Sequence, residues 1–364
     1  MTNTHNSPTQ VPTPLILQTR KLVSVREISR IERIRRYPFA IAHIDGWQVV
    51  VGARGYKDGD LVVFFEIDSF VPKTDRFWEL FADPSRENGI VTFRGRQGYR
   101  VRSTRVFGRL SQGLVFPLAC FPEINRPYQD KITAVGYRAA TEELLSRSFA
   151  ETLGVMKWEF TERAESLPSL GRPPAFIRPA GWPRIQDVEK SVFASKKREK
   201  LWVITEKLDG VTMTVAEDLM DRDDNLYWQT AKASGVLQAL PRIDGLPNIA
   251  VIGELCGSSI QGNTMNYPEA THEFAVFAMW DIDQARYLPP GKTLEICKRH
   301  DLKHTPVIGV MTIGEVAKDA GELLRKAEGR GCYGGIREGF VFHAFDGADH
   351  FKVISNAWLL QTGK

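Results

Sequence analysis

A lysine and an aspartate lie two residues apart, between two apolar segments of residues 201–215 (LWVITEKLDGVTMTV). The pattern predicts an apolar strand, a turn at EKLDG and an alternating strand. A lysine amine acts as a nucleophile only when it is unprotonated, which requires desolvation or nearby cations. Asp209 is placed to orient the amine of Lys207, and Gly210 allows a tight turn. Taken alone, the same pattern also fits a hairpin turn with a surface lysine.

Isolated charges recur in the apolar strands that follow. Glu254 lies in VIGELCG, Glu338 in GIREGFVF and Lys352 in FKVIS, and residues 273–281 (EFAVFAMWD) form an aromatic strand. A carboxylate in an apolar strand needs a partner, for which a ribose hydroxyl or a metal would serve. Each segment alone fits a core or surface position. Because the segments share an isolated charge within an apolar strand, together they indicate polar groups that converge on a ligand.

In this order the segments resemble the covalent nucleotidyltransferase superfamily, which contains ATP-dependent DNA and RNA ligases and mRNA capping enzymes. EKLDG looks like motif I, GELCG like motif III, EFAVF like motif IIIa, REGFVF like motif IV and FKVIS like motif V. Upstream, KDGDLVVF and LSQGL look like the OB domain that precedes the ligase domain in the Naegleria-type RNA ligases. Downstream, GSSIQGN and FKVISNAWLL also look like that clade. The resemblance therefore covers about residues 15–364.

The resemblance implies an ATP-dependent RNA ligase that joins RNA 3′-hydroxyl and 5′-phosphate ends, as in nick sealing and RNA repair. Lys207 would attack the α-phosphate of ATP and carry AMP covalently. The residues implied to bind ATP or AMP are Glu206, Lys207, Asp209, Gly210, Glu254, Phe277 and Lys352.

Within that set, the resemblance gives Glu254 the ribose, Phe277 the adenine (with Phe274 as the other possible register) and Lys352 the α-phosphate. Glu338 and Asp209 would position a metal, and hard oxygen ligands favour Mg²⁺ or Mn²⁺.

One motif of this family has no counterpart. Motif Ia, whose arginine contacts the ribose, should lie between motifs I and III, but only AEDLMDRDDN separates Val215 from LYWQTAKASG. Arg222 is the one arginine in this gap and lies among acids. Three explanations stay open: a gene-model artefact, a degenerate ligase that retains only adenylylation, or another arginine that compensates. The alternative function is an RNA-binding protein on a degenerate ligase scaffold.

The chain differs from related enzymes in two further ways. Ile354 stands where phage relatives have a second motif V lysine, and the sequence stops soon after motif V. DNA ligases and capping enzymes carry another OB domain there, so we expect neither activity.

The elements that must position these residues predict an α+β protein of two parts. Residues 1–14 form a disordered tail, and residues 15–135 an OB-like, nucleic-acid-binding β-barrel with strands at 46–52 and 61–67. Residues 136–200 contain a linker and the start of the catalytic domain. Residues 201–364 form a nucleotidyltransferase domain of antiparallel sheets flanked by helices.

Arginines are concentrated in residues 94–109 of the predicted barrel, with no acid between them. They are Arg94, Arg96, Arg100, Arg102, Arg105 and Arg109. The pattern favours contacts with RNA phosphates, with Phe93, Tyr99 and Phe107 available to stack on bases. A basic surface without a partner, with the aromatics in the core, is the other interpretation.

The composition agrees with a soluble globular protein. The 364 residues are 43% hydrophobic and 25% charged, and residues 1–135 hold 20 Lys and Arg against 13 Asp and Glu. We expect no membrane span and no secretory signal. Four widely spaced cysteines argue against a zinc site or a disulfide framework and indicate an intracellular location, cytoplasmic or nuclear. We expect a monomer, although the sequence does not determine the oligomeric state.

Overall fold

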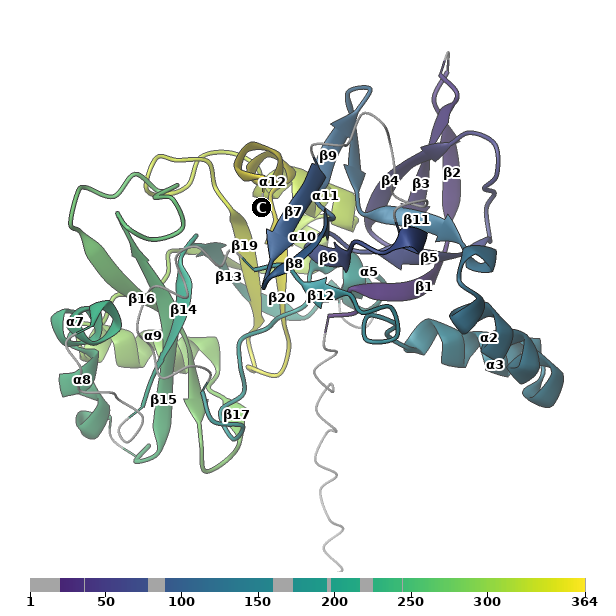
Figure 1. Cartoon of the computed structure of the whole chain (residues 1–364). Helices are drawn as coiled ribbons and strands as arrows, with labels where there is room; N and C mark the ends of the chain where they lie inside the picture. The colour runs from purple at the N-terminus through teal and green to yellow at the C-terminus, as the bar shows by residue number, and fades with distance from the viewer. Residues whose placement is uncertain are drawn as a thin grey trace, which may run out of the picture.

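The computed structural model describes residues 20–35, 37–77, 89–159, 173–194, 198–216, 225–243 and 245–363. Two halves lie side by side: a β-barrel with a helical hairpin, and a larger half built on two sheets (Figure 1). The predicted α+β class is therefore confirmed. The predicted tail, residues 1–14, lies outside the described residues. No helix in the described ranges is long and apolar enough to cross a membrane.

The barrel consists of short strands in small antiparallel sheets. Two sheets have three strands each, in order of pairing: β1 (Val23–Glu27), β5 (Leu61–Phe65) and β11 (Leu114–Pro117), and β2 (Arg30–Arg33), β3 (Phe39–Ile44) and β4 (Trp47–Gly52). A four-stranded sheet contains β12 (Met156–Lys157), β6 (Ser69–Pro72), β8 (Arg96–Arg100) and β7 (Ile90–Phe93). The remaining pair is β10 (Arg109–Gln112) with β9 (Ser103–Val106). In β4, Trp47, Val49 and Val51 are buried and alternate with partly exposed residues, as the two-residue period of a strand requires. They pack inside the barrel.

A helical hairpin of α2 (Pro122–Val135) and α3 (Tyr137–Ser146) extends from the barrel (Figure 1). Its apolar side chains Ile124 and Leu144 pack with β1 and β5 in one core. The domain boundary predicted near residue 135 falls at the end of α2, whereas packing on the barrel continues to β12. An amphipathic helix shows in the sequence that one face is buried, but it does not show against what.

The larger half contains two four-stranded antiparallel sheets. The first is β18 (Val307–Thr312), β13 (Leu201–Lys207), β19 (Gly339–Ala344) and β20 (His350–Ile354), and the second is β14 (Val211–Val215), β15 (Ile249–Gly257), β16 (His272–Asp281) and β17 (Arg286–Tyr287), each in order of pairing. Helices cover the outer faces: α5 (Ile185–Val192), α10 (Ile313–Val316) and α11 (Ala320–Ala327) on the first, and α7 (Leu226–Ala233), α8 (Val236–Ala239) and α9 (Pro290–Arg299) on the second. Apolar residues of both inner faces pack with Trp182 between the sheets.

The last helix joins the two halves. In α12 (Asn356–Thr362), Trp358 and Leu359 enter the barrel core beside Ile44 and Trp47. The side chain of Ser355 caps this helix by accepting a hydrogen bond from Trp358 N at 3.2 Å. The barrel core is therefore completed by the larger half.

Candidate active site

Lys207 ends β13 and points at a carboxylate. Its Nζ lies 2.9 Å from Glu338 Oε1, and Glu338 directly precedes β19, the strand paired with β13. Nζ also donates to Leu208 O at 3.4 Å. Glu338 is buried, and its Oε2 has no hydrogen-bond partner in the described part of the chain.

Two further carboxylates face the same lysine. Glu254 on β15 accepts from Gly210 N at 3.2 Å and from Thr212 Oγ1 at 3.3 Å. Asp209 Oδ2 accepts from Thr264 Oγ1 at 2.5 Å. Gly210 owes its identity to this close approach, because a Cβ there would lie 2.4 Å from Leu255 O. The turn at EKLDG thus bridges the two sheets.

The group around Lys207 has more carboxylates than ammonium groups. Burial alone would lower the pKa of Lys207, but Glu338, Glu254 and Asp209 outweigh it and raise that pKa. Burial, reinforced by the neighbouring carboxylates, raises the pKa of Glu338 to about 7 despite the contact with Lys207. Three carboxylates around one ammonium suit a divalent cation, and the unpartnered Glu338 oxygen is a hard ligand of the kind that Mg²⁺ and Mn²⁺ prefer.

The carboxylates do not form a complete metal cage. Among the residues that the structure describes, no three His, Cys, Asp or Glu side chains group in a way that could hold a metal. A metal here would therefore share its ligands with phosphate oxygens and water, as Mg²⁺ commonly does.

Cationic groups lie on the side of the site nearest the barrel. Lys352, on β20, is paired with Val341 of β19. Its backbone bridges that of Arg184, and Lys352 N donates to Pro183 O at 2.9 Å. Burial, followed by the charges of Arg184 and Lys207, lowers the pKa of Lys352 to about 7. Arg184 is buried, and its Nε and Nη1 make no hydrogen bond within the described ranges. These donors are suited to phosphate oxygens.

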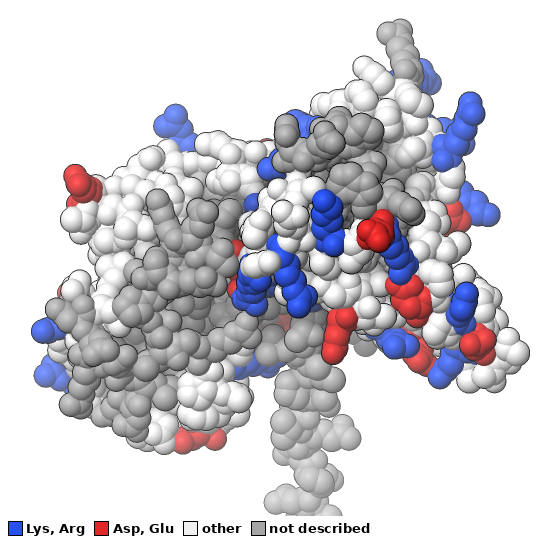
Figure 2. Space-filling model, viewed as in Figure 1, with Lys and Arg blue, Asp and Glu red and all other residues white. Residues whose placement is uncertain are grey.

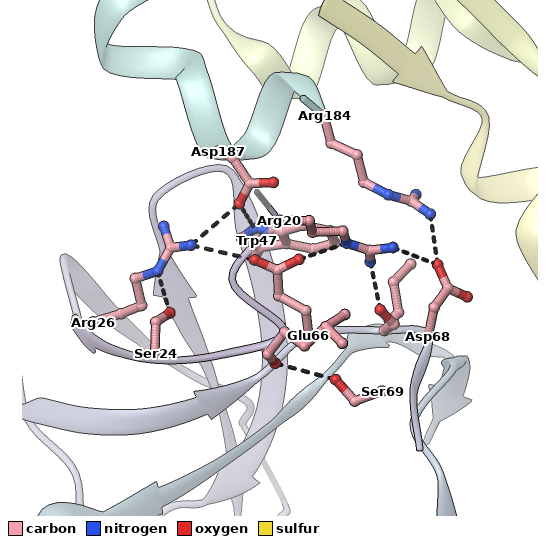
Figure 3. A network of polar contacts seen from close by, with 11 residues as sticks. Arg20, Ser24, Arg26, Trp47, Glu66, Asp68, Ser69, Arg184 and Asp187 are labelled. Atoms are coloured by element: carbon pink, nitrogen blue, oxygen red, sulfur yellow. Dashed lines mark hydrogen bonds and ion pairs between the residues drawn. The ribbon is translucent and has the colours of Figure 1, made fainter. Parts of the chain in front are cut away.

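A polar network fixes Arg184 to the barrel (Figure 3). Arg184 Nη2 donates to Asp68 Oδ2 at 3.0 Å, and Arg20 Nη1 donates to the same oxygen at 2.8 Å. Arg20 Nε also donates to the fully buried Glu66 at 2.8 Å. Arg26 donates both to Glu66 and to Asp187, which lies on α5. The barrel therefore holds a cationic side chain of the candidate site in place.

Of two further predicted nucleotide contacts, Glu206 lines the same pocket as Lys207, whereas Phe277 lies between the two sheets. Phe277 is the extra residue of a bulge in β16, since Ile252 pairs with Ala278 and Gly253 with Val276. It is half-buried against Trp182 on the inner face, whereas Phe274 is buried in the outer core. Glu206 accepts from Cys332 N at 3.1 Å with both oxygens. In this structure Glu206 anchors the loop before β19.

The six arginines do not share one strand face. Arg94 lies in the turn after β7, Arg96 and Arg100 on β8, Arg105 on β9 and Arg109 on β10, with Arg102 between β8 and β9. All but Arg100 are exposed; Arg100 is partly buried 3.8 Å from Asp68. Figure 2 shows Lys and Arg side chains near the middle of one face, where the halves meet. Of the aromatics, Phe93 and Tyr99 are buried, whereas Phe107 is exposed.

Some residues that matter here were not predicted from the sequence. Arg184 lies in a proline-rich connector without periodicity, and Asp68 and Thr264 lie in loops. A basic residue next to a helix start is a weak signal, since only the fold shows that Arg184 borders Lys352. Residues 217–224 of the motif Ia gap, including Arg222, lie outside the described residues.

Comparisons with known proteins agree with this geometry. The RNA ligase family model matches residues 200–354, and an OB-fold domain model matches residues 22–118. A mutant of Naegleria gruberi RNA ligase with AMP and Mn is 30% identical at a TM-score of 0.79, and the match covers 93% of this chain and 98% of that chain. The chain belongs to the RNA ligase family. The predicted family and the predicted OB-fold domain are thus confirmed.

Other solved structures similar to this ligase contain further ligands. Naegleria gruberi RNA ligase with PPi is 30% identical at a TM-score of 0.79, and the match covers 93% of the present chain and 98% of the Naegleria chain. A mutant of the same Naegleria enzyme with ATP and Mn is 28% identical at a TM-score of 0.78, and the match covers 94% of the present chain and 98% of the Naegleria chain. A search of curated proteins found no match. The nucleotides and the metal in these relatives agree with the ATP and divalent metal expected from the sequence.

Proposed function

We propose that this ligase is ATP-dependent and joins RNA 3′-hydroxyl and 5′-phosphate ends through lysyl-AMP on Lys207. The observation that carries the proposal is the 2.9 Å contact between Lys207 Nζ and Glu338 in a buried carboxylate group. A lysine held among ionisable groups between two sheets is positioned for nucleophilic chemistry. The similar structures that contain ATP or AMP with Mn support the nucleotide and the metal.

In the first step Lys207 must lose a proton and attack the α-phosphorus of ATP. Glu338 Oε1 is in contact and is the acceptor for that proton. A bond forms between Nζ and phosphorus while the bond to pyrophosphate breaks, and pyrophosphate leaves with the electron pair. Lys352 and the N–H groups of Arg184 offset the negative charge that develops.

A divalent cation would be held by Glu338 and Asp209 together with phosphate oxygens. When bound, it supplies charge neutralisation at the phosphate and helps to lower the pKa of Lys207. The residues fit it, because the carboxylates outnumber the ammonium and one Glu338 oxygen has no partner in the described ranges.

In the second step an RNA 5′-phosphate oxygen attacks the AMP phosphorus and Lys207 leaves, taking up a proton. In the third, an RNA 3′-hydroxyl attacks the 5′-phosphorus and AMP leaves. The exposed arginines of β8 to β10 supply sequence-independent contacts with the RNA backbone. We also propose an intracellular location, cytoplasmic or nuclear, which four free cysteines in the described residues support.

The test is incubation with ATP labelled at the α-phosphate, with Mg²⁺ or Mn²⁺. Lys207→Ala should retain no label, while Lys200→Ala, a lysine before the same strand paired with Asp346 and Asp349, should be labelled like the wild type. A labelled Lys207→Ala protein would overturn the site, and an unlabelled wild type would favour an RNA-binding role. Labelled wild type should then seal a nicked RNA duplex with a 5′-phosphate and leave a 5′-hydroxyl nick unsealed.

A further inference from the structure

The loop between α11 and β19 holds both chain neighbours of the reactive lysine. On one side of Lys207, Cys332 N donates to both carboxylate oxygens of Glu206 at 3.1 Å. On the other side, the ring of Tyr333 packs against the small buried cluster that contains Leu208. Two consecutive residues of this loop therefore support the chain before and after Lys207.

Tyr333 is itself fastened to the second sheet. Its hydroxyl donates to Glu273 on β16, and the hydroxyl of Tyr267 donates to the same carboxylate oxygen. Lys303 pairs with the other oxygen of Glu273, and its Nζ lies 5.1 Å from the centre of the Tyr333 ring. Burial alone would raise the pKa of Glu273, but Lys303 and the two phenols outweigh it and lower that pKa. The anchor of Tyr333 is therefore a carboxylate at neutral pH.

The same loop touches the segment that holds Asp209. Arg337 N donates to Gly329 O at 2.9 Å, which closes the base of the loop. A Cβ at Gly335 would lie 2.5 Å from the carbonyl oxygen of Thr264, so the two segments are in close contact. Thr264 is the residue whose hydroxyl binds Asp209. The loop thus abuts the turn at Lys207 from the second sheet as well as from the first.

Tyr333 shares a pocket with Lys207, Asp209 and Glu338. Its polar contacts in the described part of the chain are with Glu273 and a neighbouring lysine, and neither is implied to bind the nucleotide. A nucleophile must approach phosphorus closely and in line, and a misplacement of about 1 Å can slow a reaction about a hundredfold. Loosening this support should therefore disturb the attack by the amine more than the binding of ATP.

We propose that Tyr333, anchored by Glu273, is a positioning residue for the adenylylation of Lys207. The inference rests on the proposed function, in which Lys207 attacks ATP. In that step a bond forms between Nζ and the α-phosphorus, pyrophosphate leaves with the electron pair, and the proton passes to Glu338. Tyr333 touches none of the reacting atoms and acts through the turn that carries the amine. The final sealing step, in which an RNA 3′-hydroxyl attacks and AMP leaves, does not use this amine as a nucleophile.

The first assay is single-turnover labelling with ATP labelled at the α-phosphate, at saturating ATP and Mg²⁺. Tyr333→Ala should slow labelling about a hundredfold. Its Kd for α,β-methylene-ATP, measured by calorimetry, should stay within about threefold of the wild type, because the ground-state contacts are kept. Tyr333→Phe keeps the ring against Leu208 and loses only the hydroxyl, so it should slow labelling about tenfold. Tyr56→Ala is the matched control: this half-buried tyrosine of the barrel donates to Val115 O at 3.2 Å, and its loss should leave the labelling rate unchanged.

The second assay separates positioning from a general effect on the fold. Tyr333→Ala should seal a nicked RNA duplex whose 5′-phosphate already carries AMP at close to the wild-type rate. Equal slowing of labelling and of this sealing would overturn the inference, and so would labelling of Tyr333→Ala at the wild-type rate. If that variant does not fold, Tyr333→Phe decides in the same way. An unlabelled wild type would instead mean that the proposed function fails, whereas a labelled wild type with unaffected variants removes only the role of Tyr333.

Discussion

Replacing Asp68 with asparagine would remove the charge around which three arginines meet at the junction of barrel and ligase half. Asp68 lies 2.8 Å from Arg20, 3.0 Å from Arg184 and 3.8 Å from Arg100. Burial alone would raise the pKa of Asp68, but these guanidinium groups outweigh it and lower that pKa. Asparagine keeps the size and leaves the cations facing a neutral amide.

The cost follows from burial. Removing one partner of a buried ion pair destabilises a protein by roughly 3–5 kcal/mol. Because the Asp68 side chain is 17% exposed, we expect the lower end, about 3 kcal/mol, or about 6–12 °C in Tm. Since the folded-state pKa of Asp68 is depressed, the stabilisation is present above the unfolded value near 3.9 and is lost as the pH falls below it. The difference between the two proteins should therefore shrink below about pH 4.

The assay is thermal and urea unfolding at pH 7 and again in acid. Glu32→Gln is the control, because Glu32 is 44% exposed in its pair with Arg30 and should cost less than about 1 kcal/mol. Labelling with ATP should fall in Asp68→Asn, since Arg184 loses its anchor. A variant within about 1 kcal/mol of the wild type at pH 7 would refute the idea that this network holds the halves together.

Two further predictions concern the reacting groups. Because the pKa of Lys352 is lowered to about 7, its amine is cationic below that pH and neutral above it, so calorimetry should show affinity for α,β-methylene-ATP falling severalfold from pH 6 to 8.5. Lys352→Arg should flatten this profile, and a flat wild-type profile would contradict the assignment. Chelation of divalent metal should abolish lysyl-AMP formation and Mn²⁺ should restore it, while Glu338→Gln should slow labelling by about a hundredfold or more. Labelling of Glu338→Gln at the wild-type rate would show that its contact with Lys207 is not used.

The sequence was most informative where a single charge interrupts an apolar strand. Glu254 and Lys352 follow that pattern, and the fold brings them near Lys207 because their strands pair or face one another. The pattern cannot give the direction of a side chain at a strand end. Glu206, next to Lys207, contacts the backbone of Cys332 and also lines the pocket at Lys207.

Contacts between distant segments could not be predicted from the sequence. Arg184 and Asp68 have no local pattern, and only the docking of the halves brings them within 3.0 Å. Among the aromatics near the arginines, burial separates Phe93 and Tyr99 from Phe107, a distinction that strand alternation alone left open. The bulge at Phe277 likewise depends on its pairing with β15.

The docking of α12 has a consequence for how the protein folds. The core of the N-terminal barrel contains Ile354, Trp358 and Leu359, which are translated long after the strands they cover. During synthesis part of the apolar core of the barrel stays exposed until these residues are made, since contacts of high sequence separation form slowly. A nascent chain halted before β20 should therefore expose this surface and depend on chaperones, even though its barrel strands are complete. The core of the OB-fold half is therefore completed only after the last helix of the ligase half has been made.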